Sequence, residues 1–276
     1  MKKIKYFIVV IVAALFISCE GNGFLNNESP SAMDASAVFS SEINTEQAIF
    51  GVYHLFGTNN SYLNRIACGY VGLNTDIEYS TKSTGDDAEL MLYNISLSPK
   101  GNLSDTKGKS DLWMSLNTMI ERCNNIIEGL EKYGDVDKNE VMAAFLGEAY
   151  FLRSFAYLEQ VKYWGDVPAR FVSLAEDNQG VNARKTDRNE IFEHLRIDLL
   201  KAADLLPWSE ERIGASQNNV GRANKSAALA LLARADLMYA GKAVRPLTID
   251  DPTGYSVRYN IVENAGCRRE RTADCP

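Results

Sequence analysis

The chain has 276 residues, of which 46% are hydrophobic, 24% charged and 10% aromatic, a composition typical of globular proteins. Its formal net charge is −7, which argues against a nucleic-acid partner because phosphate binding requires clustered lysine and arginine side chains. The chain has two histidines, His54 and His194, and these are too few for a histidine-rich metal site.

The first 18 residues have the pattern of an export signal. Three lysines in the first five residues precede an apolar run from Tyr6 to Ile17, which is shorter than the roughly 20 residues of a membrane-spanning helix. Ser18 and Cys19 follow this run as in a bacterial lipobox, so we predict a signal peptide over 1–18 and lipidation of Cys19. The alternative is an ordinary secretory signal with an incidental cysteine. Residues 19–44 are expected to form a lipid-anchored tether, because the segment after Cys19 is polar and rich in glycine and asparagine.

Hydrophobic periodicity predicts a mainly α-helical domain over residues 45–245. Two of its helices are apolar on most sides, which indicates that they are buried between neighbours. Asp137 and Glu140 have the spacing of a capping box at the start of the longest helix. Helix pairs rich in alanine and aromatic residues predict TPR-like stacking, although the repeat length is irregular. The predicted helices span 45–56, 110–133, 138–163, 187–206 and 224–239.

Two other segments differ from this helical pattern. Residues 59–109 are rich in Asn, Ser, Thr, Gly and Asp. A long insertion of this kind in a helical domain is either functional or disordered, and a binding loop is expected here if it is functional. Residues 246–276 are polar and lack helical periodicity, so they are expected to be irregular. Four cysteines remain after the lipobox; they have no metal-binding spacing, and their pairing is left open. They are Cys68, Cys123, Cys267 and Cys275.

The sequence contains no motif that predicts catalysis, a metal site or a cofactor. Gly108-Lys109-Ser110 resembles the end of a phosphate-binding loop, but Leu103 occupies the position where that motif needs a glycine. Glu148 is the one acidic residue in an unusual position, since it lies on the most apolar helix. We expect it to form a packing ion pair with Arg153 or Arg234, and a catalytic acid is the alternative.

Five segments in order resemble the signatures of the SusD/RagB family of outer-membrane nutrient-uptake lipoproteins from Bacteroidota. Their glycine and alanine positions permit close helix packing. The resemblance implies a TPR-like helical superhelix with a loop-rich ligand face. The segments are Trp113 with Asn124-Asn125, Gly147-Glu-Ala-Tyr-Phe-Leu-Arg-Ser-Phe-Ala-Tyr157, Tyr163-Trp-Gly-Asp-Val-Pro168, Asp198-Leu-Leu-Lys-Ala-Ala-Asp-Leu-Leu-Pro207 and Gly221-Arg-Ala-Asn-Lys-Ser-Ala-Ala-Leu-Ala-Leu-Leu-Ala-Arg234.

The resemblance also implies a function and a partner. Family members capture glycans, or in some cases peptides, at the cell surface and deliver them to a SusC-like TonB-dependent transporter. It implies attachment to the outer membrane through Cys19, facing the cell exterior, and no cofactor; calcium occurs among relatives, but no ligands for it are assigned here. Asp76 and Tyr79 are the candidate ligand-binding residues, because they lie in the insertion where the family often places its site. Aromatic faces stack on sugar rings, and carboxylates bond their hydroxyls.

The chain departs from the family in length. Members are usually much longer and use a large C-terminal portion in the ligand site, so we expect that portion of the fold to be missing here, through truncation, frameshift or a partial sequence. Two other functions remain open. One is a TPR-type adaptor that binds peptides or proteins at the membrane surface, and the other is a helical carbohydrate-active enzyme that uses Glu148.

Overall fold

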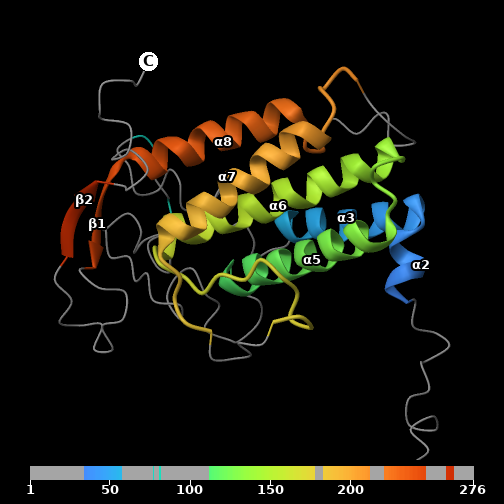
Figure 1. Cartoon of the computed structure of the whole chain (residues 1–276). Coiled ribbons are helices and arrows are strands. Elements are labelled where there is room, and N and C mark those ends of the chain that lie inside the picture. The colour runs from blue at the N-terminus through green and yellow to red at the C-terminus, as the bar shows by residue number, and fades with distance from the viewer. Residues whose placement is uncertain are drawn as a thin grey trace, which may run out of the picture. The chain divides into compact units, whose positions relative to one another are not determined.

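The computed structural model describes residues 34–57, 77, 81, 112–177, 183–211, 221–246 and 259–263. Apart from Asp34 and Ala35, these residues belong to one compact unit, Ser36–Pro276. The fold is mainly helical, as predicted, and no helix in the described ranges is long and apolar enough to cross a membrane. Figure 1 shows the elements: α2 (Ala35–Phe39), α3 (Glu42–Gly57), α5 (Leu112–Tyr133), α6 (Glu140–Trp164), α7 (Arg188–Leu205), α8 (Lys225–Ala240), β1 (Lys242–Pro246) and β2 (Tyr259–Glu263).

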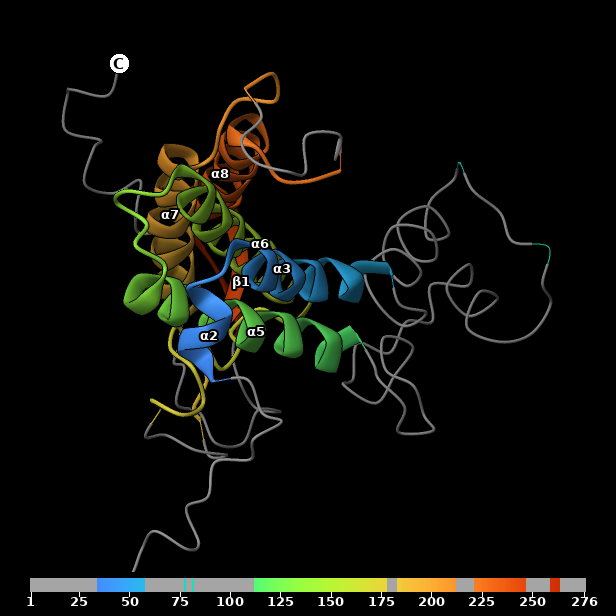
Figure 2. The ribbon, with the colours of Figure 1, turned by 90° about the vertical axis from the view of Figure 1, so that its right-hand side faces the viewer.

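Helix α6 is the centre of the helical array. It packs against α5, α7 and α3, and α7 packs in turn against α8. Consecutive long helices run antiparallel from α5 to α8, as expected for TPR-like pairs, and α3 lies beside α5 (Figures 1 and 2). Helix α6 is buried on nearly all sides, which confirms the interpretation of its apolar surface.

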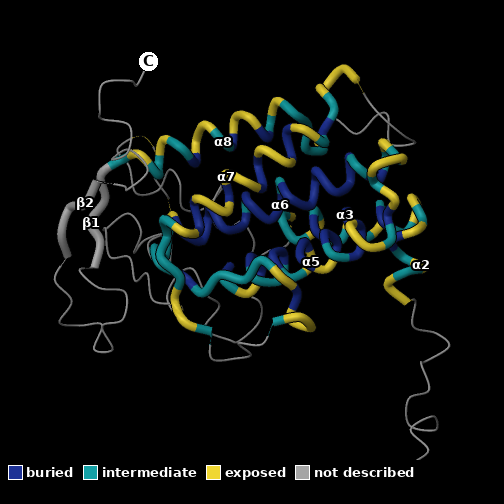
Figure 3. Tube along the Cα trace, in the orientation of Figure 1, coloured by how far each residue is buried: buried dark blue, intermediate teal, exposed yellow. Residues whose placement is uncertain are grey.

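Helix α8 is the second helix with an apolar sequence on most sides, but it is buried on one face only. Its inner face buries Ala228, Leu231 and Ala235 against the array. Its outer face carries Leu229 and Leu237, whose exposed fractions are 41% and 76%. Within the described part of the chain α8 therefore has neighbours on one side only, as Figure 3 shows by its colouring.

The helix starts follow side-chain capping. Asp187 and Asn224 cap α7 and α8 by accepting from the backbone N–H groups of Asn189 and Ala227, and these starts agree with the sequence prediction. The predicted start of α6 at Asp137 is wrong, because Asp137 lies in a turn. Asn139 caps α6 instead, with its side-chain oxygen 3.0 Å from Val141 N and 3.2 Å from Met142 N.

Helix α6 ends at a glycine with a positive φ angle. Gly165 has a φ of 73°, and its N–H donates to the carbonyl of Val161, so the chain turns sharply without the steric cost of a side chain. Beyond it, Val167 pairs with Thr186 in an isolated antiparallel bridge. This bridge closes the base of the segment that joins α6 to α7, which we call the α6–α7 connection; its described residues are 165–177 and 183–187.

The tail after α8 is not irregular throughout. Strands β1 and β2 pair in antiparallel register, with Lys242 opposite Glu263 and Pro246 opposite Tyr259. The prediction of an irregular segment over 246–276 is therefore wrong for residues 259–263. The absence of helical periodicity excluded a helix here, but it did not exclude a strand that pairs with β1.

Gly147 allows α6 to pack closely against the end of α7. A Cβ at this position would lie 2.9 Å from Leu206 Cγ and 3.1 Å from Leu205 Cβ, whereas a Cβ at Gly57 would meet nothing within 4 Å. We expect Gly147→Leu to lower the free energy of unfolding by about 1–3 kcal/mol through overpacking, as measured by urea denaturation. Gly57→Leu is the matched control; equal losses at both positions would contradict the packing argument.

Candidate functional site

A cavity of about 610 Å³ lies between the first half of α5 and the α6–α7 connection. This volume falls within the range of about 300–1,000 Å³ that is usual for ligand pockets. The lining mixes apolar and polar side chains from both walls. It consists of Trp113, Met114, Asn117, Thr118, Ile120, Glu121, Arg122, Tyr157, Pro168, Arg170, Leu174 and Ala183.

The wall formed by the α6–α7 connection is held in place by a polar stripe on α5. Glu121 accepts from Leu174 N at 3.0 Å, and Glu128 accepts from Ser173 N at 2.5 Å. Between them, Asn124 donates to the carbonyls of Arg170 and Val172 at 3.2 and 2.8 Å. The spacing of 121, 124 and 128 places these three side chains on one helical face, so the stripe fixes the backbone of the opposite cavity wall.

Tyr157 fixes the same wall from α6. Its hydroxyl donates to the carbonyl of Arg170 at 2.5 Å and accepts from the N–H of Arg170 at 2.6 Å. Burial raises the pKa of Tyr157 above its usual value, so the hydroxyl keeps the proton that it donates. The backbone of Arg170 is thereby held at both its polar groups.

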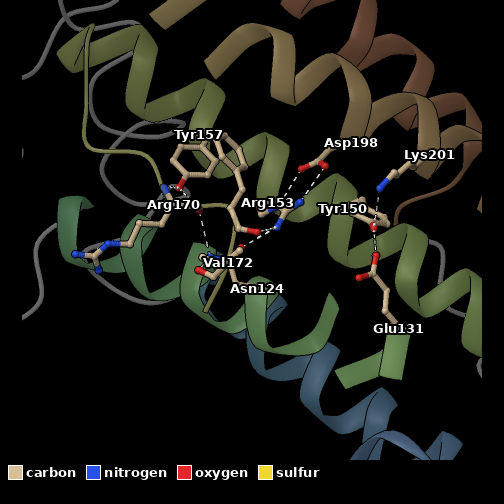
Figure 4. Close-up of polar contacts among 10 residues, drawn as sticks. Asn124, Glu131, Tyr150, Arg153, Tyr157, Arg170, Val172, Asp198 and Lys201 are labelled. Carbon is tan, nitrogen blue, oxygen red and sulfur yellow. Dashed lines mark hydrogen bonds and ion pairs between the residues drawn. The ribbon is translucent and has the colours of Figure 1, made fainter. Parts of the chain in front are cut away.

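Arg153 joins α5, α6, α7 and the connection at one buried point (Figure 4). Its Nε and Nη2 donate to the two carboxylate oxygens of Asp198 at 2.8 and 2.9 Å. Its Nη1 donates to Asn124 Oδ1 at 2.8 Å and to the carbonyl of Phe171 at 3.0 Å. Arg153 and Asp198 are each 4% exposed, and a charge pair at this depth is tolerated only with such complete hydrogen bonding.

A second charge cluster, buried at Glu148 and partly buried at Arg222 and Glu46, joins α3 and α6 to the residues that precede α8. Arg222 contacts Glu148 Oε1 with Nη2 at 2.8 Å and Glu46 Oε1 with Nη1 at 2.6 Å. Tyr53 donates its hydroxyl proton to Glu148 Oε2 at 2.9 Å and accepts from Ala223 N at 2.8 Å. Burial raises the pKa of Glu148, and Arg222 opposes this rise by favouring the carboxylate.

The contacts of Glu148 match the packing interpretation made from the sequence. The carboxylate is buried and bonded to Arg222 and Tyr53, and it does not line the cavity. The expected ion pair is therefore present, but both predicted partners are wrong. Arg153 pairs with Asp198, and Arg234 approaches Glu159 at 3.7 Å. The sequence did offer one signal for the true partner, because Arg222 belongs to the family signature segment that starts at Gly221.

The other predicted site residues lie outside the described ranges. These are Asp76 and Tyr79 in the insertion and Cys19 at the predicted lipidation site. Cys123 is a buried free thiol whose pKa burial raises to about 12, and the remaining three cysteines are not described. His194 stacks on Phe171 with ring centroids 4.0 Å apart. No group of three or more metal-binding side chains occurs within the residues that the structure describes.

Comparison with known proteins places this fold in a family. A SusD-like family model, described as "Starch-binding associating with outer membrane", matches residues 23–237. The chain belongs to the SusD-like family. A curated relative, SusD-like protein P25 of Formosa agariphila, is 27% identical over 198 residues, which cover 69% of this chain and 36% of the relative. SusD-like protein P2 of the same organism is 31% identical over 98 residues, 36% of this chain and 19% of the relative.

Solved structures share the fold. A SusD homologue from Bacteroides thetaiotaomicron matches with a TM-score of 0.62 at 20% identity. The match covers 80% of this chain and 39% of the homologue's chain. A laminarin-binding SusD-like protein matches with a TM-score of 0.53 at 18% identity. That match covers 71% of this chain and 40% of the laminarin-binding protein's chain. The present chain thus spans less than half the length of the relatives that it matches.

The family signatures now have a physical meaning. Polar residues of separate signature segments bond to one another: Asn124 and Asp198 both bond Arg153, and Glu148 bonds Arg222. The cavity residues Asn117 and Thr118 were not predicted as a site. They belong to the polar stripe of an amphipathic helix, where solvent exposure is the more common explanation.

The pairing of Arg153 with Asp198 can be tested by a double-mutant cycle. We expect Arg153→Met or Asp198→Leu alone to lower the free energy of unfolding by about 3–5 kcal/mol, because each leaves the other charge buried and unpaired. The double variant should lose clearly less than the sum of the two. Urea denaturation measures all four free energies, and strict additivity would show that the two charges are not coupled.

Proposed function

We propose that this protein is a cell-surface lipoprotein that captures glycans and passes them to a SusC-like TonB-dependent transporter in the outer membrane. The observation that carries the proposal is the match of residues 23–237 to a family described as starch-binding and associated with the outer membrane. The likeness in fold to a laminarin-binding protein gives further support.

The chemistry of the described surface is compatible with sugar binding. The cavity beside α5 combines aromatic and aliphatic side chains with amide, hydroxyl and charged groups, which is the mixture that recognises sugar rings and their hydroxyls. In this proposal Asp76 and Tyr79 contribute from the insertion.

Attachment to the membrane is proposed to rest on lipid at Cys19. The formal net charge of −7 offers no attraction to an anionic lipid surface. Acyl chains supply the missing affinity, since each buried methylene contributes about 0.8 kcal/mol and two or more chains give stable anchoring.

The capture function is tested with the full chain expressed in a Bacteroidota host and purified from its membranes. We expect retarded migration in native gels that contain a glycan such as starch or laminarin, with no release of reducing ends. A β-barrel transporter should copurify with the protein. Binding of peptides with no retardation by any glycan would favour the adaptor function, and glycan turnover that is lost in Glu148→Gln would favour an enzyme.

The anchor is tested by Cys19→Ala in the same host. We expect the variant to move from the membrane fraction to the soluble fraction, as measured by immunoblotting after ultracentrifugation, because it lacks the sulfur that carries the lipid. Ser18→Ala is the matched control and should stay in the membrane, since alanine is also a small residue before the cleavage site. Retention of Cys19→Ala in the membrane would contradict lipidation at this cysteine.

A further inference from the structure

The cavity beside α5 offers hydrogen-bond acceptors on its helical wall. The Asn117 amide donates to the carbonyl of Trp113 at 2.8 Å, and the Thr118 hydroxyl donates to the carbonyl of Met114 at 2.8 Å. The Thr118 hydroxyl proton and one of the two Asn117 amide N–H groups are therefore used within their own helix. The amide oxygen of Asn117 and the lone pairs of Thr118 remain as acceptors, beside the second Asn117 N–H as a donor. Both residues line the cavity.

Side chains of both signs of charge surround the cavity. Arg122 donates to the carbonyl of Gly51 at 2.6 Å, and Arg170 forms an ion pair with Asp177 at 2.8 Å. Glu121 adds a negative charge to the same lining. Glu121 and Asp177 together balance the charges of Arg122 and Arg170, so the cavity offers no net positive charge to a carboxylate or sulfate on a ligand.

Apolar side chains stand on both walls of the cavity. Met114 on α5 and Leu174 on the connection are 54% and 52% exposed, and Trp113 lines the cavity beside them while its ring packs edge-on against Trp164, with ring centroids 5.1 Å apart. Sugar rings present apolar C–H faces together with hydroxyl donors, and aromatic and aliphatic walls with acceptors between them match both features.

We propose that this cavity binds a short stretch of an uncharged oligosaccharide, whose hydroxyl groups donate hydrogen bonds to Asn117 Oδ1 and Thr118 Oγ1. The inference rests on the proposed glycan-capture function and assigns it a site and a charge preference. The polar stripe of Glu121, Asn124 and Glu128 has a different role: it positions the opposite wall of the cavity, and the acceptors proposed for the ligand come from Asn117 and Thr118.

The test compares the full-length protein with the double variant Asn117→Leu, Thr118→Val in native gels and calorimetry. The neutral probes are starch, laminarin and mannan, and the anionic probes are polygalacturonate and alginate. We expect a neutral probe to bind and the double variant to bind it at least about tenfold more weakly, since two hydrogen bonds are lost. Asn44→Leu is the matched control, because the Asn44 amide also donates to a backbone carbonyl but lies outside the cavity; it should leave affinity unchanged.

The outcomes separate the site from the function. Equal affinity of the wild type and the double variant for a neutral glycan would overturn the site and leave the capture function standing. Failure of the wild type to bind any glycan would overturn both. Anionic glycans that bind as tightly as neutral ones would overturn the charge preference. Thr118→Val alone, which preserves side-chain shape, should give a smaller loss in the same direction, and circular dichroism verifies the fold of each variant.

Discussion

The guanidinium of Arg153 sets the position of every wall around the candidate site. It extends from α6 to a carboxylate on α7, an amide on α5 and a carbonyl of the α6–α7 connection. An arginine buried to this extent is costly unless its donors are satisfied. The three segments are therefore held in the one arrangement that supplies those partners, and the cavity lies where two of them, α5 and the connection, face each other.

A second arginine, Arg222 before α8, holds other segments together in the same way. It pairs with Glu148 of α6 and Glu46 of α3, and Tyr53 of α3 completes the cluster by bonding Glu148. This explains why the family signatures are recognisable although the helical repeat is irregular. What must match is a set of charges and their partners across helices, together with glycines such as Gly147 that let the helices approach. Loops between them can vary in length without disturbing these contacts.

The sequence predicted the five long helices and two of the three N-caps that the structure describes, because periodicity and capping are local. It missed α2, and the expected tether over 19–44 is wrong for residues 35–39 and 42–44, which are helical and bury Phe39 in the core. It did not identify the partner of Glu148, since Arg222 lies 74 residues away and the sequence pattern favoured Arg153 or Arg234. The start of α6 was misplaced because Asp137 and Asn139 both offer capping oxygens. The cavity was missed for a related reason: the acceptors of α5 resemble an ordinary solvated stripe until the path of the connection is known.

Helix α5 thus divides its polar residues between two tasks. Glu121, Asn124 and Glu128 bond the backbone of the connection, while Asn117 and Thr118 lie about one turn earlier and, among the residues that the structure describes, bond carbonyls of their own helix. The first group determines where the opposite wall lies, and the second can change without moving it. In the proposed site, ligand preference can therefore diverge at 117 and 118 among proteins that keep the charge pair of Arg153 and Asp198, since stability and the proposed recognition depend on different residues of one helix.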